Sequence, residues 1–412
     1  MKETTTAHYH ALLGLDRNWK VTSVEFFPQK MMVDIRIEFC GDSISCPKCQ
    51  AACSKADMAP ERTWRHLDTM QFETKIHAVV PRCQCSKCGV LTLPVPWADK
   101  HSRFTILFEE VAIAVIEACS SVSAAARLLN LDWDATHNIM KRAVDRGLAR
   151  RDLENIEHVG IDEKSFGRGH DYVSIMTDLD QSRVLEVVPE RTREATDSLW
   201  KTLSKEQRAV VKAVSLDMWP AFMSSTKENC PKADIVHDKF HVSKYLGEAV
   251  DQVRRQENRV LSQEGDDRLK KTRQLWLFGR EKLSEEDRGY LYSLQQADLK
   301  TGRAWSLKEN FRYFWECTTL DDANMTFRGW YGWATRSQLK PIIKVAKMLK
   351  RHIDGLMSYI THRITNAVSE GFNSRIQSLK SAARGFRNFA NYRTRILFFC
   401  GKLDMTLISL TH

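Results

Sequence analysis

HVGIDE at residues 158–163 and VVKAVSLD at residues 210–217 each place an acidic residue directly after a run of apolar side chains. Both runs predict buried β-strands, because short apolar segments rich in β-branched residues are typical of strands in a covered sheet. Asp162 and Asp217 then stand where their strands end. If the two strands are neighbours in one sheet, both carboxylates project from the same edge. The alternative is that both acids are helix caps or solvated strand ends.

Three more segments in this part of the chain predict strands, at residues 172–177, 184–188 and 235–237. Helical segments at 196–203 and 220–228 separate the later strands. Three successive strands followed by strand–helix alternation indicate a mixed sheet with helices on its faces. The sequence therefore predicts a multidomain α/β protein built around such a sheet.

A third acid, Glu370, lies in the helical segment 366–376, which we expect to pack beside the same sheet edge. Three carboxylates repel one another, and Mg²⁺ or Mn²⁺ relieves that repulsion because hard cations prefer oxygen ligands. Two such ions activate an attacking hydroxyl and stabilise the leaving oxygen of a phosphodiester. We therefore predict Asp162, Asp217 and Glu370 as catalytic residues and as ligands of two metal ions. The rival acids are Glu163 and Asp238, with Asp178 and Asp180 behind them.

The chain is basic overall. Its 412 residues include 62 Lys and Arg against 52 Asp and Glu, a net charge of +10, with an isoelectric point of about 9.0. This balance favours nucleic acid as the partner, although a merely basic enzyme fits the charge equally well. The start lacks the apolar core of a signal peptide, and the longest apolar stretch, residues 106–119, contains three glutamates. We therefore expect a cytoplasmic, nucleoid-associated protein with no membrane partner.

Seven of the eleven cysteines fall within residues 40–88. They include two C-x-x-C pairs, CPKC at 46–49 and CSKC at 85–88. Two such pairs bind one Zn²⁺ tetrahedrally, each pair forming a knuckle whose backbone N–H groups point at the sulfurs. Reduced structural cysteines are the alternative, and Cys53 and Cys83 are the substitutes for a misassigned ligand. The predicted ligands of one structural zinc are Cys46, Cys49, Cys85 and Cys88.

Residues 121–142 read SVSAAARLLNLDWDATHNIMKR and predict two short helices around a turn at Asn130. Ser123 is expected to cap the first helix, and Asp132 or Asp134 the second. Small polar and basic residues at the start of the second helix are what a major-groove reader presents, although an Ala-rich hairpin without a DNA role has a similar pattern. The residues expected to be exposed for DNA binding are Thr136, His137, Asn138, Lys141 and Arg142.

Residues 243–360 are helical and rich in tryptophan, and most of these rings are expected in the core. One or two of them are candidates to stack on a flipped base. Basic residues gather on one helical face at 340–351 and again after Glu370. Beside a phosphodiester site, phosphate contact is favoured over a solvated face. The predicted phosphate contacts are Lys344, Lys347, Arg375, Lys380, Arg384 and Arg387, and the same basic sets include Lys340, Arg351, Arg393 and Arg395.

Six motifs, taken together, resemble the DDE transposases of the insertion-sequence L-three family. They are VGIDE at 159–163, RGHDY at 168–172, SLDM at 215–218, DKFHV at 238–242, the pattern N-A-x-x-E-G-x-N-x-x-I at 366–376, and GFRN at 385–388. The resemblance covers nearly the whole chain, including the cysteine block and the helix-turn-helix segment. The chain departs from the pattern at Trp133 and in its extra cysteines, which leaves the zinc-ligand details open.

This resemblance implies a ribonuclease-H-like catalytic fold interrupted by a helical insertion, and it implies Asp162, Asp217 and Glu370 as the triad. The roles of Asp238 and His241 stay open between supporting, DNA-contacting and metal-binding. The expected activity is that of a DNA transposase. It binds the terminal inverted repeats of an insertion sequence, hydrolyses phosphodiester bonds at the ends and joins the 3′-OH to target DNA by a two-metal-ion mechanism, as a homodimer or higher oligomer. A regulator with a degenerate sheet domain, and a nuclease that cuts without joining, are the alternatives.

We expect five segments along the chain. They are a zinc-binding domain at 1–100, a helix-turn-helix DNA-binding domain at 101–155, the first part of the catalytic core at 156–242, a helical insertion at 243–360, and the final core helices with Glu370 at 361–412.

Overall fold

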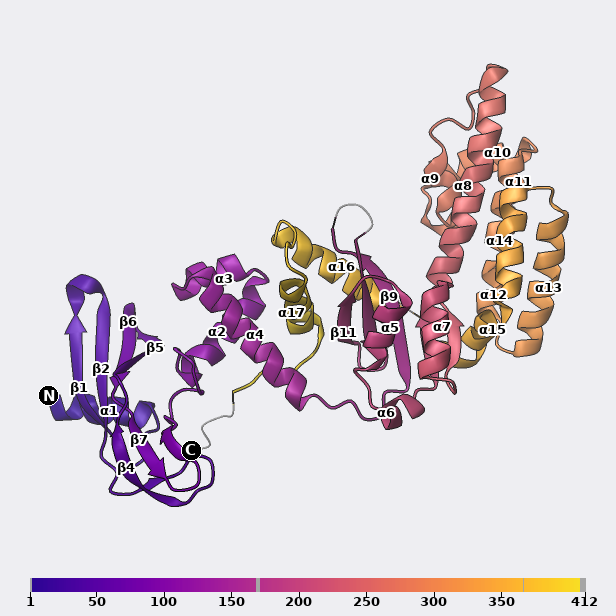
Figure 1. Ribbon diagram of the computed structural model, residues 1–412. Helices are drawn as coiled ribbons and strands as arrows, with labels where there is room; N and C mark the ends of the chain where they lie inside the picture. Colours follow the sequence, from indigo (N-terminus) through magenta and orange to yellow (C-terminus); the bar gives the residue numbers. More distant parts are fainter. Residues whose placement is uncertain (1, 168–170, 366, 408–412) are drawn as a thin grey trace. The chain divides into compact units, whose positions relative to one another are not determined.

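The computed structural model describes residues 2–167, 171–365 and 367–407, without the side chains of residues 2–4, 280 and 367–370. The chain divides into two compact units (Figure 1). We call Met1–Arg151 with Leu403–His412 the N-terminal unit, and Asp152–Lys402 the C-terminal unit. The five segments expected from the sequence stay a prediction. None of the described helices is long and apolar enough to cross a membrane.

The N-terminal unit contains two four-stranded sheets. The first has the order β1-β2-β6-β5, with β1 at Trp19–Phe27, β2 at Met32–Phe39, β5 at Arg62–Thr69 and β6 at Phe72–Ala78. The second has the order β3-β4-β7-β8, with β3 at Ile44–Ser45, β4 at Ala52–Met58, β7 at Pro81–Cys85 and β8 at Gly89–Thr92. Helix α1 (Lys2–Leu12) packs on β1, and the 3-10 helix η1 (Pro28–Lys30) precedes β2. Alternate residues of β2 are buried with three tryptophans in the core of the first sheet, namely Val33, Ile35 and Ile37 with Trp19, Trp64 and Trp97.

Three helices follow the sheets in the N-terminal unit: α2 (Ile106–Cys119), α3 (Val122–Leu129) and α4 (Trp133–Arg150). The side chain of Asp132 caps α4 by accepting from Ala135 N–H, as one of the two predicted caps. The prediction for α3 was wrong by two residues, because Ser121 accepts from Ala124 N–H and Ser123 lies inside the helix. Asn130 ends α3 in the left-handed region at φ 51°, which confirms the predicted turn.

The C-terminal unit is built on a five-stranded mixed sheet in the order β11-β10-β9-β12-β13. The strands are β9 (His158–Ser165), β10 (Tyr172–Asp178), β11 (Arg183–Pro189), β12 (Ala213–Leu216) and β13 (Asp234–His237). Strand β12 runs parallel to both β9 and β13, while β10 is antiparallel to β9 and β11. Leu216 pairs with Ile161, and the next residues are Asp217, directly after β12, and Asp162 in β9. The prediction that Asp162 ends its strand was wrong, because β9 continues to Ser165 by pairing with β10. Strand β12 begins three residues later than predicted, because Val210 ends a helix instead.

Helices cover both faces of this sheet (Figure 1). Helices α5 (Arg193–Trp200), α6 (Lys205–Ala209) and α7 (Pro220–Asn229) follow β11 and β12 in the chain. Leu199 and Trp200 of α5 pack with Ile161 of β9 in one core. Helices α16 (Ala367–Ala382) and α17 (Phe389–Cys400) lie on the opposite face, because Asn373 of α16 bonds to Asp162, the neighbour of Ile161 in β9.

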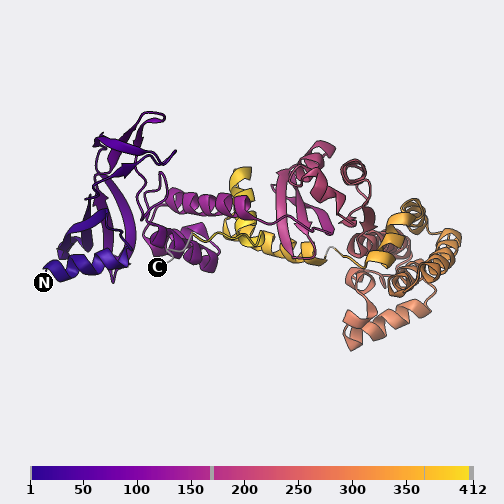
Figure 2. The same ribbon diagram turned by 90° about the horizontal axis from the view of Figure 1, so that it is seen from below.

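The remaining helices form a bundle (Figure 2) whose core is continuous with Ala213 of β12 and Val236 of β13. They are α8 (Lys239–Gln263), α9 (Arg273–Leu277), the 3-10 helix η2 (Arg280–Lys282), α10 (Glu285–Gln296), α11 (Lys300–Asn310), α12 (Arg312–Glu316), α13 (Leu320–Arg336), α14 (Lys340–Arg351) and α15 (Ile353–His362). Helix α8 starts directly after β13, where Asp238 caps it by accepting from Phe240 N–H. The first two turns of α8 therefore lie at the sheet edge that carries Asp217.

Candidate functional site

The two C-x-x-C pairs come together in the N-terminal unit. The sulfurs of Cys46, Cys49, Cys85 and Cys88 all lie within 4.8 Å of one another, and the Cys49 and Cys85 sulfurs are 3.6 Å apart. Tetrahedral Zn²⁺ with Zn–S bonds of about 2.3 Å separates its sulfurs by about 3.8 Å. The cluster therefore has the size that a zinc ion requires.

The ionisation of these thiols also fits a cation. Backbone N–H groups of Lys87 and Cys88 bond to the Cys85 sulfur and lower the pKa of Cys85 to about 6. This arrangement of N–H groups around a sulfur is the predicted knuckle. The neighbouring thiol of Cys49, together with burial, raises the pKa of Cys88 to about 12. The four sulfurs thus ionise together only when a positive ion balances them. Burial raises the pKa of Cys53 to about 11, and this substitute lies outside the four-sulfur cluster found among the described residues.

The exposed face of α4 differs from the predicted one. Thr136 is fully buried, and its hydroxyl donates to the carbonyl of Asp132. His137 is 9% exposed and its ring stacks on that of Trp133 at 4.8 Å. The expectation that Thr136 and His137 face solvent was therefore wrong, because the start of α4 packs inward on the other helices.

Asn138 and Lys141 are exposed on α4, as predicted. Arg142 is only half-exposed, because its guanidinium donates to Glu109, a carboxylate of α2 with 1% exposure. Arg142 thus balances a buried charge, which leaves Asn138 and Lys141 as the solvent-facing members of the predicted set.

Asp162 and Asp217 face one imidazole in the C-terminal unit. His241 Nε2 is 3.9 Å from Asp162 Oδ1, and His241 Nδ1 is 3.5 Å from Asp217 Oδ2. Parallel pairing of β9 with β12 produces this approach, because the two acids are the next residues after a paired Ile161 and Leu216. The sheet edge predicted from the sequence therefore brings these two carboxylates together.

Uncharged donors hold both carboxylates. The hydroxyl of Tyr245 donates to both oxygens of Asp217, at 3.1 and 3.0 Å, and Asn373 Nδ2 donates to Asp162 Oδ2 at 2.7 Å. Burial and the charge of Asp217 raise the pKa of Tyr245, which keeps it a donor. In the described part of the chain no Lys or Arg forms an ion pair with either acid. Two carboxylates without a Lys or Arg partner offer the hard oxygen ligands that a divalent cation prefers.

Glu370 belongs to the first turn of α16, and its side chain lies outside the described residues. Its neighbour by one helical turn, Asn373, is the residue that bonds to Asp162. Residues three apart share a helix face, so this part of α16 runs beside the acidic edge. Convergence of Glu370 with the two aspartates remains a proposal.

The rival acids all have structural partners. Both carboxylate oxygens of Glu163 accept from Arg191 Nη1, at 3.1 and 3.0 Å. Asp238 caps α8. The weaker rivals bond to a buried arginine and a histidine, Asp178 to Arg183 and Asp180 to His158. These contacts explain each rival acid without a metal ion.

The basic residues divide into exposed and internal sets. Lys344 and Lys347 are exposed on α14, and the exposed residues of the tail are Arg375, Arg384 and Arg387. Lys380 is half-buried and donates to the carbonyl of Ser165 at 3.0 Å. The basic sets also include Arg393, which donates to Glu186 at 2.6 Å, and Arg395, which is 5% exposed, so these two residues are engaged inside the protein.

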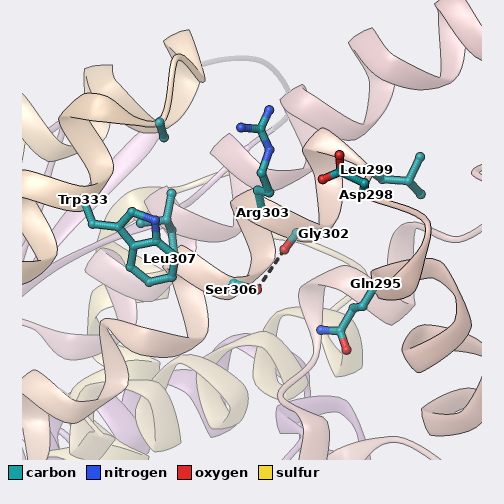
Figure 3. Close-up of a pocket in the computed structure, with 9 residues that line it drawn as sticks. Gln295, Asp298, Leu299, Gly302, Arg303, Ser306, Leu307 and Trp333 are labelled. Carbon is teal, nitrogen blue, oxygen red and sulfur yellow. Dashed lines mark hydrogen bonds between the residues drawn. The ribbon is translucent and has the colours of Figure 1, made fainter.

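Most tryptophans of the bundle are core residues, as expected. Trp276, Trp305, Trp315 and Trp330 are buried, whereas Trp333 is 42% exposed. Figure 3 shows Trp333 beside Leu307 at a pocket of about 210 Å³, with Arg303 rising from the same helix as Leu307. Trp333 is thus the one member of this set with a ring available to a ligand.

The sequence did not identify Tyr245 as part of the site. Tyr245 follows His241 by four residues, which places both on one face of a helix. That spacing was the available signal, and it needed the knowledge that one helix starts at Asp238 and continues past both residues.

Three family models match the chain. A transposase model of the DDE type and the ISL3 family matches residues 159–396, a helix-turn-helix domain of transposase family ISL3 matches 93–144, and the zinc finger of the transposases of IS204, IS1001, IS1096 and IS1165 matches 42–88. The transposase for insertion sequence element IS1001 of Bordetella parapertussis is 27% identical over 347 residues, 83% of this chain and 85% of that protein. The transposase for insertion sequence element IS1557 of Mycobacterium tuberculosis is 26% identical over 410 residues, 92% of each chain.

Proposed function

The chain belongs to the ISL3 family of transposases, and we propose that it binds the terminal inverted repeats of its element, cleaves each end and joins the 3′-OH to target DNA. The mixed sheet with its inserted bundle is then a ribonuclease-H-like catalytic domain, and Asp162, Asp217 and Glu370 are its metal ligands. A protein with these tasks works at the nucleoid.

One observation carries this proposal. Asp162 lies in β9, Asp217 directly follows the parallel neighbouring strand β12, both carboxylates approach the imidazole of His241, and α16 reaches Asp162 through Asn373. The three segments are far apart in the sequence. If their acids were only helix caps or solvated residues, nothing would require the segments to meet. Two divalent ions, when bound there, would supply charge that favours the attacking hydroxyl and the leaving oxygen of a phosphodiester.

The protein's own residues orient and hold this site. Tyr245 fixes the carboxylate of Asp217 by donating to both oxygens, and Asn373 fixes that of Asp162. His241 lies between the two acids and keeps their separation by contacting each. Fixed ligands reduce the reorganisation that accompanies catalysis.

The remaining predicted contacts serve DNA binding. Helix α4 would lie in the major groove with Asn138 and Lys141 on its exposed side, and one zinc held by the four clustered cysteines would stabilise the N-terminal unit. The exposed basic residues would neutralise phosphates, and they are Lys344, Lys347, Arg375, Arg384 and Arg387. Lys380 would act from its half-buried position beside β9. Both element ends must be held together for joining, so a dimer or higher oligomer is expected in the active complex.

Replacing Asp217 by Ala tests the proposal. End DNA should still bind with unchanged affinity, while Mg²⁺-dependent nicking of labelled end DNA should fall by at least about a thousandfold, the order of loss typical for a charge-stabilising group. Glu194→Ala is the matched control, because Glu194 is an exposed acid of α5 and should leave nicking unchanged. Full nicking by the Asp217→Ala variant would refute the assignment.

A second assay separates a transposase from a nuclease that only cuts. End DNA with a pre-formed 3′-OH, incubated with plasmid target, should give strand-transfer products. Cleavage of intact ends without such products would favour the nuclease.

A further inference from the structure

A positively charged pocket of about 370 Å³ lies against the exposed side of α4 in the N-terminal unit. One wall comes from the segment before α2, with His101 and Arg103, and the other from α4 itself. The polar residues of the second wall are Asn138, Lys141, Arg142 and Asp145. Three permanent cations thus face one acid, and the pocket adds His101 and Arg103 to the predicted DNA-binding residues Asn138, Lys141 and Arg142.

The first wall is fixed to the sheet. The amide of Arg65 in β5 donates to the carbonyl of Arg103 at 2.9 Å, and the amide of Thr105 donates to the carbonyl of Arg65 at 3.0 Å. Ser102 is buried and its hydroxyl donates to Glu109 Oε1 at 2.7 Å. The backbone at Arg103 is therefore held, while its side chain is exposed.

Glu109 connects the two walls. It accepts from Ser102 of the first wall and from Arg142 of the second, and it is almost fully buried. This bridge sets the width of the pocket and uses the charge of Arg142. In the described part of the chain neither Arg103 nor Lys141 has an ion-pair partner, so these two cations are available to a ligand.

We propose that this pocket binds a backbone phosphate of duplex DNA at the rim of the major groove that α4 enters. The inference rests on the proposed DNA-reading role of α4. The major groove is about 12 Å wide, and phosphates border it on both sides. A cation held beside the exposed face of the inserted helix, as Arg103 is, therefore meets the backbone and not the base edges. Such contacts fix register and add affinity to every sequence equally.

Asp145 limits where the phosphate sits. It lies one helical turn beyond Lys141, and its charge would repel a phosphate at that end of the pocket. The favoured position is between Arg103 and Lys141, with Asn138 and the His101 ring as additional hydrogen-bond donors. His101 needs no positive charge for this role, because a neutral imidazole has one N–H.

Replacing Arg103 by Ala tests the pocket in the full-length protein. Affinity for a labelled terminal repeat and for a scrambled duplex would be measured between 50 and 200 mM salt. Loss of one phosphate contact lowers the salt slope by about 0.9, so the fall in affinity across this range should shrink by about 3.5-fold. Both duplexes should be affected equally, and Lys141→Ala should have a similar effect on the slope. Arg17→Ala removes an exposed arginine of the same unit outside this pocket and should leave the slope unchanged.

The results separate this inference from the proposed function. An unchanged slope for Arg103→Ala, in protein with wild-type zinc content and melting temperature, would overturn the phosphate site. A loss of affinity for the terminal repeat alone would also overturn the phosphate site, because Arg103 would then read bases. If the wild-type protein does not prefer its terminal repeat, the proposed end recognition fails, while the slope on the scrambled duplex still tests the pocket.

Discussion

Replacing His66 by Gln should remove a pH-dependent part of the folding free energy. His66 is buried in β5, and this burial, with the charge of Arg65, lowers the pKa of His66 from 6.5 to about 4. Its Nδ1 lies 2.9 Å from the hydroxyl of Thr105, which also caps α2 by accepting from Phe108 N–H. This hydrogen bond joins the buried neutral ring to the start of α2, with the donor set by the tautomer of His66.

The sign follows from the lowered pKa. Below pH 6.5 the unfolded chain takes up a proton at His66 and the folded chain does not, so stability is lost between pH 6.5 and about pH 4. At about 1.4 kcal/mol for each pH unit the full loss is about 3 kcal/mol, of which about 2 kcal/mol falls between pH 7 and pH 5.

Urea unfolding of wild type and His66→Gln at pH 7, 6 and 5 measures this pH-dependent loss of stability. The difference in unfolding free energy between the two proteins should change by about 2 kcal/mol in favour of the variant as the pH falls. His8→Gln, at an exposed position, should show no such change. A constant difference for His66→Gln across the three pH values would refute the reasoning.

Three further substitutions test the packing and both sites. Gly355→Ala should destabilise the protein by about 1–3 kcal/mol in urea unfolding, because a Cβ there would lie 2.7 Å from His237 Nε2 and overpack the site. Cys85→Ser should abolish the bound zinc, measured as metal content after dialysis, since it removes the thiol with the most lowered pKa of the cluster. Tyr245→Phe should slow nicking of end DNA about tenfold with unchanged DNA affinity, because Asp217 loses hydrogen bonds worth about 1.5 kcal/mol.

Each has a matched control in the chain. Gly329→Ala adds a Cβ that meets no atom within 4 Å, and it should stabilise α13 by about 0.5–1 kcal/mol. Cys40→Ser changes an exposed cysteine outside the cluster, and Tyr292→Phe changes an exposed tyrosine. Equal effects of a test substitution and its control would contradict the corresponding contact.

The strands of the C-terminal unit were predictable because their cause is local. Val159 and Ile161, like Val214 and Leu216, are fully buried members of one core, and such runs are visible in the sequence. The neighbour relation of the two strands is a long-range property, and the sequence supported it only as a condition. The structure meets that condition with a parallel register.

The face of α4 was harder to predict because polarity does not always mean exposure. Thr136 satisfies its hydroxyl inside the helix by donating to Asp132, so it is buried at little cost. His137 loses its exposure by stacking on Trp133. Arg142 is occupied by Glu109, an acid from another helix whose approach no local pattern reveals. The contacts of Thr136 and His137 are local to α4 and its cap, whereas that of Arg142 is tertiary.

The most direct test of the central claim is a structure of the protein with end DNA and Mn²⁺, with the metal located by its anomalous scattering. We expect two Mn²⁺ peaks, each at about 2.2 Å from carboxylate oxygens of Asp162, Asp217 and Glu370. The central claim would be contradicted if Mn²⁺ bound elsewhere in the DNA complex, or if Glu370 pointed away from the two aspartates.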